Sequence, residues 1–426
     1  MIDNLYKVLP TILYFLGFCG ILVFLFYKHK DVTIKYIVSI WCVSSFFAII
    51  YQWSDSFHYD ELSIIPYLFL LICFLLTLFP LLNRGDLALT TLPDVNFKLL
   101  KVIIYLFVVF SIVPFFENLV HFVSTYSVSD TSGLADTYEE KMNGSGLKVY
   151  WLSSIGKIGN SLDGLFKDFL IFIPFYILAH KKSSKRLLVA SFIPIGNHIL
   201  FQLNASGRTL ITIFLLVGVF YVLLYRKLID GSRIKMVKKI GVIVISLALI
   251  SMSVLTLSRH EATNRNVPVP VVVGYYVAKS HVDFNEKVWY MRKHMEGDNS
   301  FGLLKSIVGL PTPKNKNNYW TEAKTGIKPN LFYTYIGDWV MDFGAGVAFV
   351  LFALVSCFAN KYFQGISRTK SIVKLFLFSS YCQVIVNGWT YNCYKTPNAL
   401  INFFISFILV LLIQILTHIK KERSFS

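Results

Sequence analysis

The chain has 426 residues, of which 55% are hydrophobic and 15% are charged, and its mean hydropathy is +0.58. This composition excludes an ordinary soluble domain, which holds more charge and fewer apolar residues. The formal net charge of +17 would suggest a nucleic-acid partner in a soluble protein. In a membrane protein, basic residues in short loops orient the helices instead, so we expect no nucleic-acid partner.

Eleven stretches are apolar enough to cross a membrane, which takes about 20 residues. The fifth is the weakest because charged residues crowd its start. We therefore expect an all-α polytopic membrane protein that forms a single integral membrane domain over residues 1–426. In chain order the stretches are 9–27, 34–52, 62–82, 99–123, 165–180, 187–203, 208–225, 240–258, 335–358, 372–391 and 398–418.

Lysine and arginine are distributed unequally over the connections between these spans. One set of alternate connections, with the C-terminus, carries 22 of them, whereas the short connections and the N-terminus on the other side carry three. Because basic short loops stay in the cytoplasm, the sequence predicts a periplasmic N-terminus and a cytoplasmic C-terminus. Two long periplasmic loops are expected, at 124–164 and, between spans eight and nine, at 259–334.

The first candidate site residue is Arg208, in a short outer turn between the sixth and seventh spans. A charge at the hydrocarbon edge is costly unless it is paired or hydrated. The helix that begins near Thr209 directs its N-terminus to the same place, which favours an anion. Arg208 is thus a candidate anion-binding residue, and the alternative is an arginine that snorkels at a helix end.

A second cluster lies where the eighth span leaves the membrane. Arginine forks fit phosphate oxygens, and histidine or glutamate can accept a proton from a hydroxyl. The cluster therefore predicts phosphate binding and a general base, and the alternative is an ordinary polar cap at the membrane interface. Its members are Arg259, His260, Glu261 and Arg265.

The middle of the second long loop contains aromatic and basic residues that are candidates for substrate binding, because aromatic rings stack on the apolar faces of sugars. The alternative is that they pack the loop against itself. These residues are Trp289, Tyr290, Arg292 and Trp320.

Two carboxylates follow at the return into the membrane. Asp338 and Asp342 are four residues apart and therefore share one face of a helix. Asp342 lies within the ninth span, where a carboxylate indicates a functional site by default. We expect it to pair with an arginine of the outer face, either to position that arginine or as a buried ion pair that fixes helix packing. The alternative is direct proton transfer by Asp342.

Motifs for cofactors are not visible in the sequence. It has no Walker loop, no Rossmann glycine fingerprint, no His-Glu-x-x-His and no CxxC pair among its six cysteines. We therefore expect no cofactor, no metal site and no disulfide framework. A reaction would use a substrate that is activated elsewhere and delivered to the outer face.

With these features together, the chain resembles the Wzy-type polymerases of bacterial O-antigen and capsule repeat units. The resemblance covers most of the chain as an architecture of many spans with a large late periplasmic loop. Its local matches are the Ser-Gly-Arg208-Thr turn and the Asp342-Phe343-Gly344 element. It implies a fold like that of the GT-C membrane glycosyltransferases and a place in the bacterial inner membrane.

The resemblance also implies the reaction. A growing glycan would leave its undecaprenyl pyrophosphate and join a sugar hydroxyl of a new lipid-linked unit, without nucleotide or metal. The arginines 208, 259 and 265 would hold the pyrophosphate, and His260 or Glu261 would activate the acceptor hydroxyl. Membrane lipid, a chain-length regulator and a flippase would be the partners.

Other functions fit the same outline. An O-antigen ligase would transfer the glycan to lipid A-core, and its deletion would leave no repeat unit on the core where a polymerase deletion leaves one. A non-enzymatic flippase or exporter is typically built from repeats with charges along a central cavity, whereas here ionisable groups cluster at the outer face. A purely structural subunit would leave Asp342 unexplained.

Overall fold

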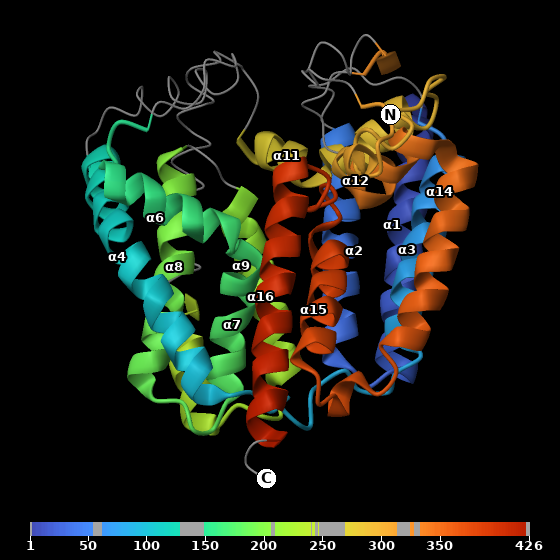
Figure 1. The fold of residues 1–426 in the computed structure, drawn as a ribbon. Helices are drawn as coiled ribbons and strands as arrows, with labels where there is room; N and C mark the ends of the chain where they lie inside the picture. Colours follow the sequence, from blue (N-terminus) through green and yellow to red (C-terminus); the bar gives the residue numbers. More distant parts are fainter. Residues whose placement is uncertain are drawn as a thin grey trace. The chain divides into compact units, whose positions relative to one another are not determined.

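The computed structural model describes residues 2–53, 62–127, 149–205, 209–239, 241–242, 246, 269–312, 324–327 and 333–422. Helices dominate this part of the chain, which contains no strand and only one isolated β-bridge, between Thr334 and Tyr391. Seven of the described helices are long and apolar enough to cross a membrane. The all-α, multi-pass character predicted from the sequence is thus confirmed (Figure 1).

The packing divides the chain into two compact units that interleave along the sequence. The first comprises Met1–Ala88, Val267–Ile366 and Ser380–Leu400, and the second comprises Leu89–Asn266, Ser367–Ser379 and Ile401–Ser426. The single membrane domain over residues 1–426 stays a prediction beside this division into two units.

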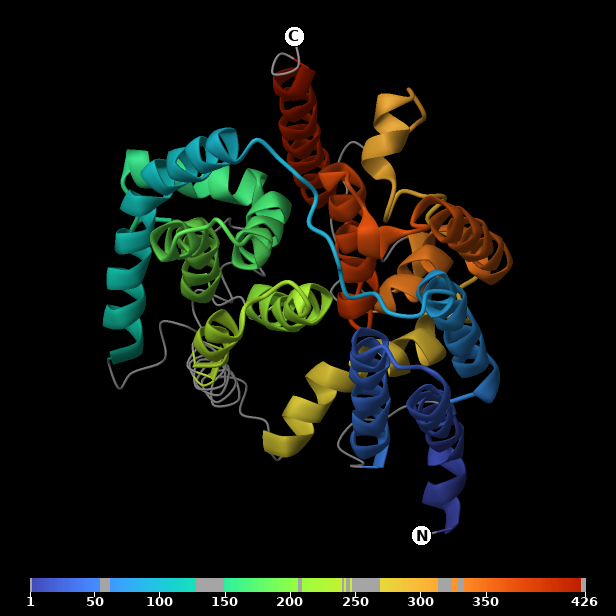
Figure 2. The ribbon, with the colours of Figure 1, turned by 90° about the horizontal axis from the view of Figure 1, so that it is seen from below.

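The first unit is built on four long helices. In this unit α3 packs against α1 and α14, and α2 packs against α1 and α11 (Figure 2). The helices are α1 (Ile2–Lys28), α2 (Val32–Trp53), α3 (Ile64–Leu82), α11 (Val269–Asp283), α12 (Gly302–Ile307) and α14 (Thr334–Tyr362), with a π-helical turn at Phe284–Val288 and the C-terminal part of α15 (Ile372–Asn387).

Aromatic side chains fill the interior of the first unit. The fully buried Trp41 of α2 packs against Phe18 and Phe74, with ring centroids 6.0 and 4.7 Å away, and its indole N–H donates to the carbonyl of Ile385 at 3.0 Å. In lipid the hydrophobic effect does not drive helices together, so close packing and hydrogen bonds of this kind hold them.

Helix α14 is interrupted at Gly344, where φ is +76° and ψ is 164°. That backbone conformation is essentially restricted to glycine. A Cβ atom at this position would also lie 2.8 Å from Nε2 of His294. The break releases the carbonyl groups of Met341 and Asp342 from the helix ladder, and both accept N–H groups from the loop before α12, from Met295 at 2.9 Å and from Glu296 at 2.8 Å.

The second unit packs α4 against α6 and α8, and α7 against α8 and α9. Its helices are α4 (Phe97–Ser127), α6 (Ser154–Leu165), α7 (Lys167–Ala179), α8 (Lys185–Asn204), α9 (Thr209–Tyr225) and most of α16 (Pro397–Glu422).

The predicted spans and the observed helices agree unequally. Seven spans correspond to the long helices α1, α2, α3, α4, α8, α14 and α16, and two correspond to the shorter apolar helices α9 and α15. The span at 165–180 is a helix of only 13 residues, α7. The end of the predicted loop 124–164 is helical, as α6, because its small residues let it pack closely on α4 at Gly159. The span at 240–258 lies almost entirely outside the described residues.

Large apolar side chains cover outward faces of the long helices. Phe26 of α1, Val109 of α4 and Phe358 of α14 are all more than half exposed. Polar side chains such as Asp163, Asn197 and Asp342, by contrast, are buried. Apolar surface outside and satisfied polar groups inside is the arrangement that a lipid solvent requires.

Candidate functional site

The predicted site residues divide into two groups. Five lie in the described part of the first unit: Trp289, Tyr290, Arg292, Asp338 and Asp342. The remaining six fall outside the described residues: Arg208, Arg259, His260, Glu261, Arg265 and Trp320.

The two carboxylates of α14 bind one loop. Asp342 is fully buried, and its oxygens accept the backbone N–H groups of Asn299 and Ser300, each at 2.8 Å. The side-chain amide of Asn299 lies 3.3 Å from Oδ1 of Asp338. The carboxylates therefore do share a face, as their spacing predicts, and together they fix the loop at 295–300 to the start of the helix.

Asp338 also reaches the segment after α15. It is fully buried, and its Oδ2 accepts the N–H of Asn392 at 2.7 Å, while Nζ of Lys395 lies 3.2 Å from its Oδ1. Three donors thus surround one carboxylate, and both of its oxygens accept hydrogen bonds. Among the described residues, backbone amides lie beside Asp342 and a lysine lies beside Asp338. The pairing of Asp342 with an outer-face arginine stays a prediction, because Arg208, Arg259 and Arg265 lie outside the described residues.

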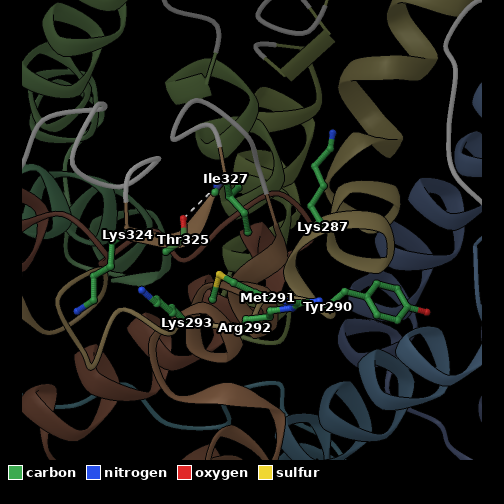
Figure 3. A pocket seen from close by; sticks show the side chains of 9 residues that line it. Lys287, Tyr290, Met291, Arg292, Lys293, Lys324, Thr325 and Ile327 are labelled. Carbon is green, nitrogen blue, oxygen red and sulfur yellow. Dashed lines mark hydrogen bonds between the residues drawn. The ribbon is translucent and has the colours of Figure 1, made fainter.

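A basic groove lies next to this fixed loop. Its volume is about 740 Å³, and it is lined by the π-helical turn, the four residues 290–293 and the short segment 324–327 (Figure 3). Four of the lining residues are cationic: Lys287, Arg292, Lys293 and Lys324. We call this feature the basic groove; sites for small ligands commonly fall within about 300–1,000 Å³.

The four cations of the basic groove differ in their partners. Lys287 is held by Asp283 at 2.7 Å and by Glu286 at 3.2 Å. Lys324 lies 3.7 Å from Glu296. The exposed Arg292 and Lys293 contact no acidic side chain among the described residues. Two positive charges are therefore open to an anionic ligand, and guanidinium and ammonium groups both bind phosphate oxygens.

Asp283 is the buried member of this charge network. The side chain lies just before the π-helical turn and is 2% exposed. Burial raises the pKa of its carboxyl above the ordinary value, although Lys279 and Lys287 both oppose the shift. The ion pairs with Asp283 and Glu286 fix Lys287 at the edge of the basic groove, whereas no acidic side chain of the described residues fixes Arg292 or Lys293.

The two predicted aromatic residues take different places. Tyr290 lines the basic groove and is 57% exposed, so its ring is available to a ligand. Trp289 packs instead beside Phe69 and Phe284, with ring centroids 5.2 and 6.1 Å away. Trp289 therefore secures the groove wall to α3 and does not line the groove, which corresponds to the alternative of loop packing.

The π-helical turn itself is anchored to α3. Asn285 accepts the N–H of Ser63 at 3.0 Å and donates to the carbonyl of the same residue at 2.6 Å. The sequence analysis missed this anchor, and it also missed Lys287, Lys324 and Asn299. The spacing of Asp283 and Lys287, four residues apart, is a local signal for Lys287 alone.

No family model, no curated protein and no solved structure matches this chain. The site must therefore be interpreted from its own chemistry. Among the described residues no group of three His, Cys, Asp or Glu side chains is placed to hold a metal ion. What the described part of the site offers is cationic donors, one exposed aromatic ring and a rigid support.

Proposed function

We propose that this chain is a bacterial inner-membrane glycosyltransferase that polymerises undecaprenyl-pyrophosphate-linked oligosaccharide units at the periplasmic face. The basic groove is the observation that carries the proposal. It places Arg292 and Lys293, which contact no acidic side chain in the part of the chain that the structure describes, beside the exposed ring of Tyr290. A lipid-linked glycan presents the complementary chemistry, since a pyrophosphate needs cationic donors and a sugar ring stacks on an aromatic face.

The support of the groove suits transfer from a bound substrate. The carboxylates of α14 fix the loop at 295–300 through backbone amides, and Asn285 fixes the π-helical turn to α3. Rate enhancement from charge stabilisation depends on donors that are already in place when the leaving group departs. A pyrophosphate is a good leaving group, so cationic donors and a positioned acceptor hydroxyl are the main requirements.

The proposal includes the topology that the sequence predicts. Eleven spans, with the N-terminus outside, place the segment 259–334 and with it the basic groove in the periplasm. Arg208, Arg259 and Arg265 are proposed as further ligands of the pyrophosphate, with His260 or Glu261 as the general base. Their roles rest on the sequence, because they lie outside the described residues.

The test is the length of the glycan made by groove variants. Arg292→Ala combined with Lys293→Ala should lower polymerisation by on the order of 10²-fold, as expected for the loss of charge-stabilising donors. Single repeat units should then accumulate on the lipid. The measurement is the ladder of lipid-linked and released glycan, at equal protein levels. Lys7→Ala, which removes an exposed cation of α1 outside the groove, is the matched control.

Two results would contradict the proposal. A wild-type ladder in the double variant would remove the groove from the reaction. A strain lacking the protein that attaches no repeat unit at all to its acceptor, in place of a single unit, would identify a ligase and not a polymerase.

A further inference from the structure

The second unit contains a carboxyl group that the proposed reaction does not use. Asp163, in the last turn of α6, is fully buried between α4 and α8. Its only polar partners among the described residues are Ser111 of α4, whose Oγ lies 2.7 Å from Oδ1, and Asn197 of α8, whose Nδ2 lies 2.7 Å from Oδ2. Both partners are neutral. An ionised carboxylate here would be a buried charge without a cation, which is strongly unfavourable.

A chain of hydrogen bonds runs from Trp151 to Asp163, and Trp151 fixes the direction of each bond in it. The indole N–H of Trp151 can only donate, so the Asn118 atom 2.9 Å from it is the amide oxygen. Asn118 then donates its amide N–H to the oxygen of Asn197 at 2.8 Å. Asn197 in turn can only present its N–H to Asp163. Oδ2 of Asp163 is therefore an acceptor.

The single proton of the Ser111 hydroxyl decides whether Oδ1 of Asp163 carries a proton. The Ser111 hydroxyl has one proton but lies within reach of two oxygens, the carbonyl of Phe107 at 2.6 Å and Oδ1 of Asp163 at 2.7 Å. If Asp163 were ionised, one of these short oxygen pairs would have no proton between its atoms. If Oδ1 carries a proton, it donates to Ser111, and Ser111 donates to Phe107, so every donor finds an acceptor.

We propose that Asp163 is a proton-binding site, occupied at neutral pH, in which the carboxylic acid donates from Oδ1 to Ser111 and accepts from Asn197 at Oδ2. The ligand is a proton and not a metal cation. A cation needs oxygen ligands, whereas Asn197 turns its N–H, and not its oxygen, toward the carboxyl. Asp163 lies inside the packed helices of the second unit, where its side chain is shielded from solvent.

Other titratable groups on the surrounding helices do not pair with Asp163. On α8, the ring of His198 lies near Asp163, since its Cε1 would be 3.8 Å from a Cβ atom placed on the neighbouring Gly164. The partners of Asp163 are nevertheless Ser111 and Asn197. On α4, Glu117 accepts the N–H of Ser153 at the other end of α6. Lys167 and Asp168 begin α7. The proton of Asp163 is therefore held by its neutral partners and by burial.

Infrared spectroscopy of the full chain in lipid tests the assignment directly. The wild-type protein at neutral pH should show the carbonyl band of a protonated carboxyl that shifts in D2O. The band should disappear in Asp163→Asn and remain in Asp168→Asn, the matched control at the nearest other buried aspartate. If the band persists in Asp163→Asn, the proposal is overturned.

Wild-type protein alone gives a second measurement, which does not depend on any variant folding. Dicyclohexylcarbodiimide adds to protonated carboxyl groups in apolar surroundings, so labelling at neutral pH should be found by mass spectrometry on the peptide that contains Asp163. Labelling should fall as the pH is raised. A peptide that stays unlabelled across neutral and acidic pH would overturn the proposal.

The direction in which stability changes with pH distinguishes a protonated Asp163 from an ionised one. A proton retained in the folded state means a folded pKa above the unfolded one, so the folding equilibrium of the wild type should weaken as pH rises, relative to Asp163→Asn, by at most roughly tenfold per pH unit. An ionised Asp163 would give the opposite sign, with the wild type losing stability relative to the variant as pH falls. That outcome would contradict the proposal.

Discussion

The two units bury aspartate side chains in opposite ways. In the first unit, Asp338 and Asp342 receive backbone N–H groups, an amide and a lysine, all of which are donors. In the second unit, Asp163 meets one amide N–H and one hydroxyl, whose single proton has two oxygens within reach. The comparison teaches that burial alone does not decide the charge of a carboxyl in a membrane helix bundle. Each donor that reaches a carboxyl favours its charged form and opposes the effect of burial.

The same substitution in the two units should therefore have unequal effects. Asp342→Asn turns an N–H₂ group toward the N–H of either Asn299 or Ser300, which leaves a buried donor unsatisfied, and we expect a loss of roughly 2–3 kcal/mol in stability. Asp163→Asn replaces a protonated carboxyl by a group of the same shape and hydrogen-bonding pattern, so it should cost close to nothing at acidic pH. At neutral pH the variant should be more stable than the wild type, because the wild type must take up a proton to fold. Thermal unfolding of both variants in the full chain measures the difference. Equal losses in the two variants would contradict the difference between the buried aspartates of the two units.

Asp342 also shows what could be predicted from the sequence. The spacing of four residues correctly placed Asp338 and Asp342 on one face, because helical periodicity is local. The partner of Asp342 could not be found that way, since Asn299 and Ser300 come from a loop more than 40 residues earlier in the chain. A loop that folds back onto a helix leaves no periodic pattern, and an arginine was the expected partner only because charge pairing is the commonest solution.

The basic groove and Asp163 extend this lesson. Tyr290 and Arg292 were predictable from loop composition, but Lys324 joins them from a segment more than 30 residues later. For Asp163 the sequence showed only a charge near a weak span. Its partners Ser111 and Asn197 lie on different helices, 52 and 34 residues away. The sequence thus gives helices and their faces, whereas sites assembled from several helices depend on packing.

The break in α14 supports the first half of the comparison, because it frees the carbonyls that hold the loop beside Asp342. Gly344→Ala should cost about 1–3 kcal/mol, since alanine is strained at φ +76° and its Cβ would meet the His294 ring. Gly346→Ala is the matched control, because a Cβ there meets nothing within 4 Å. Thermal unfolding compares the two variants.

Combining Gly344→Ala with His294→Ala separates the two causes of that loss. The double change relieves the contact with the ring but not the backbone strain, so only part of the stability should return. Full recovery would show that the ring contact is the whole effect. A Gly344→Ala variant as stable as Gly346→Ala would mean that α14 runs unbroken in solution and that the loop is held by the carboxylates alone.

Asp283 sharpens the comparison as an intermediate case, since it has cationic partners yet keeps a raised pKa. Burial outweighs the attraction of Lys279 and Lys287, whose Nζ atoms lie 3.9 and 2.7 Å from its oxygens. A carboxyl whose folded pKa exceeds its unfolded pKa of about 3.9 contributes stability below that value and loses it as pH rises through the folded pKa. The unfolding free energy should therefore fall with rising pH in that interval, by at most about 1.4 kcal/mol per pH unit.

Asp283→Asn should remove this slope, and Lys287→Met should extend it to higher pH because one opposing cation is gone. Thermal unfolding of the three proteins as a function of pH is the measurement. Parallel curves for the wild type and Asp283→Asn would show that the two lysines fully compensate the burial, and Asp283 would then belong with Asp338 and Asp342.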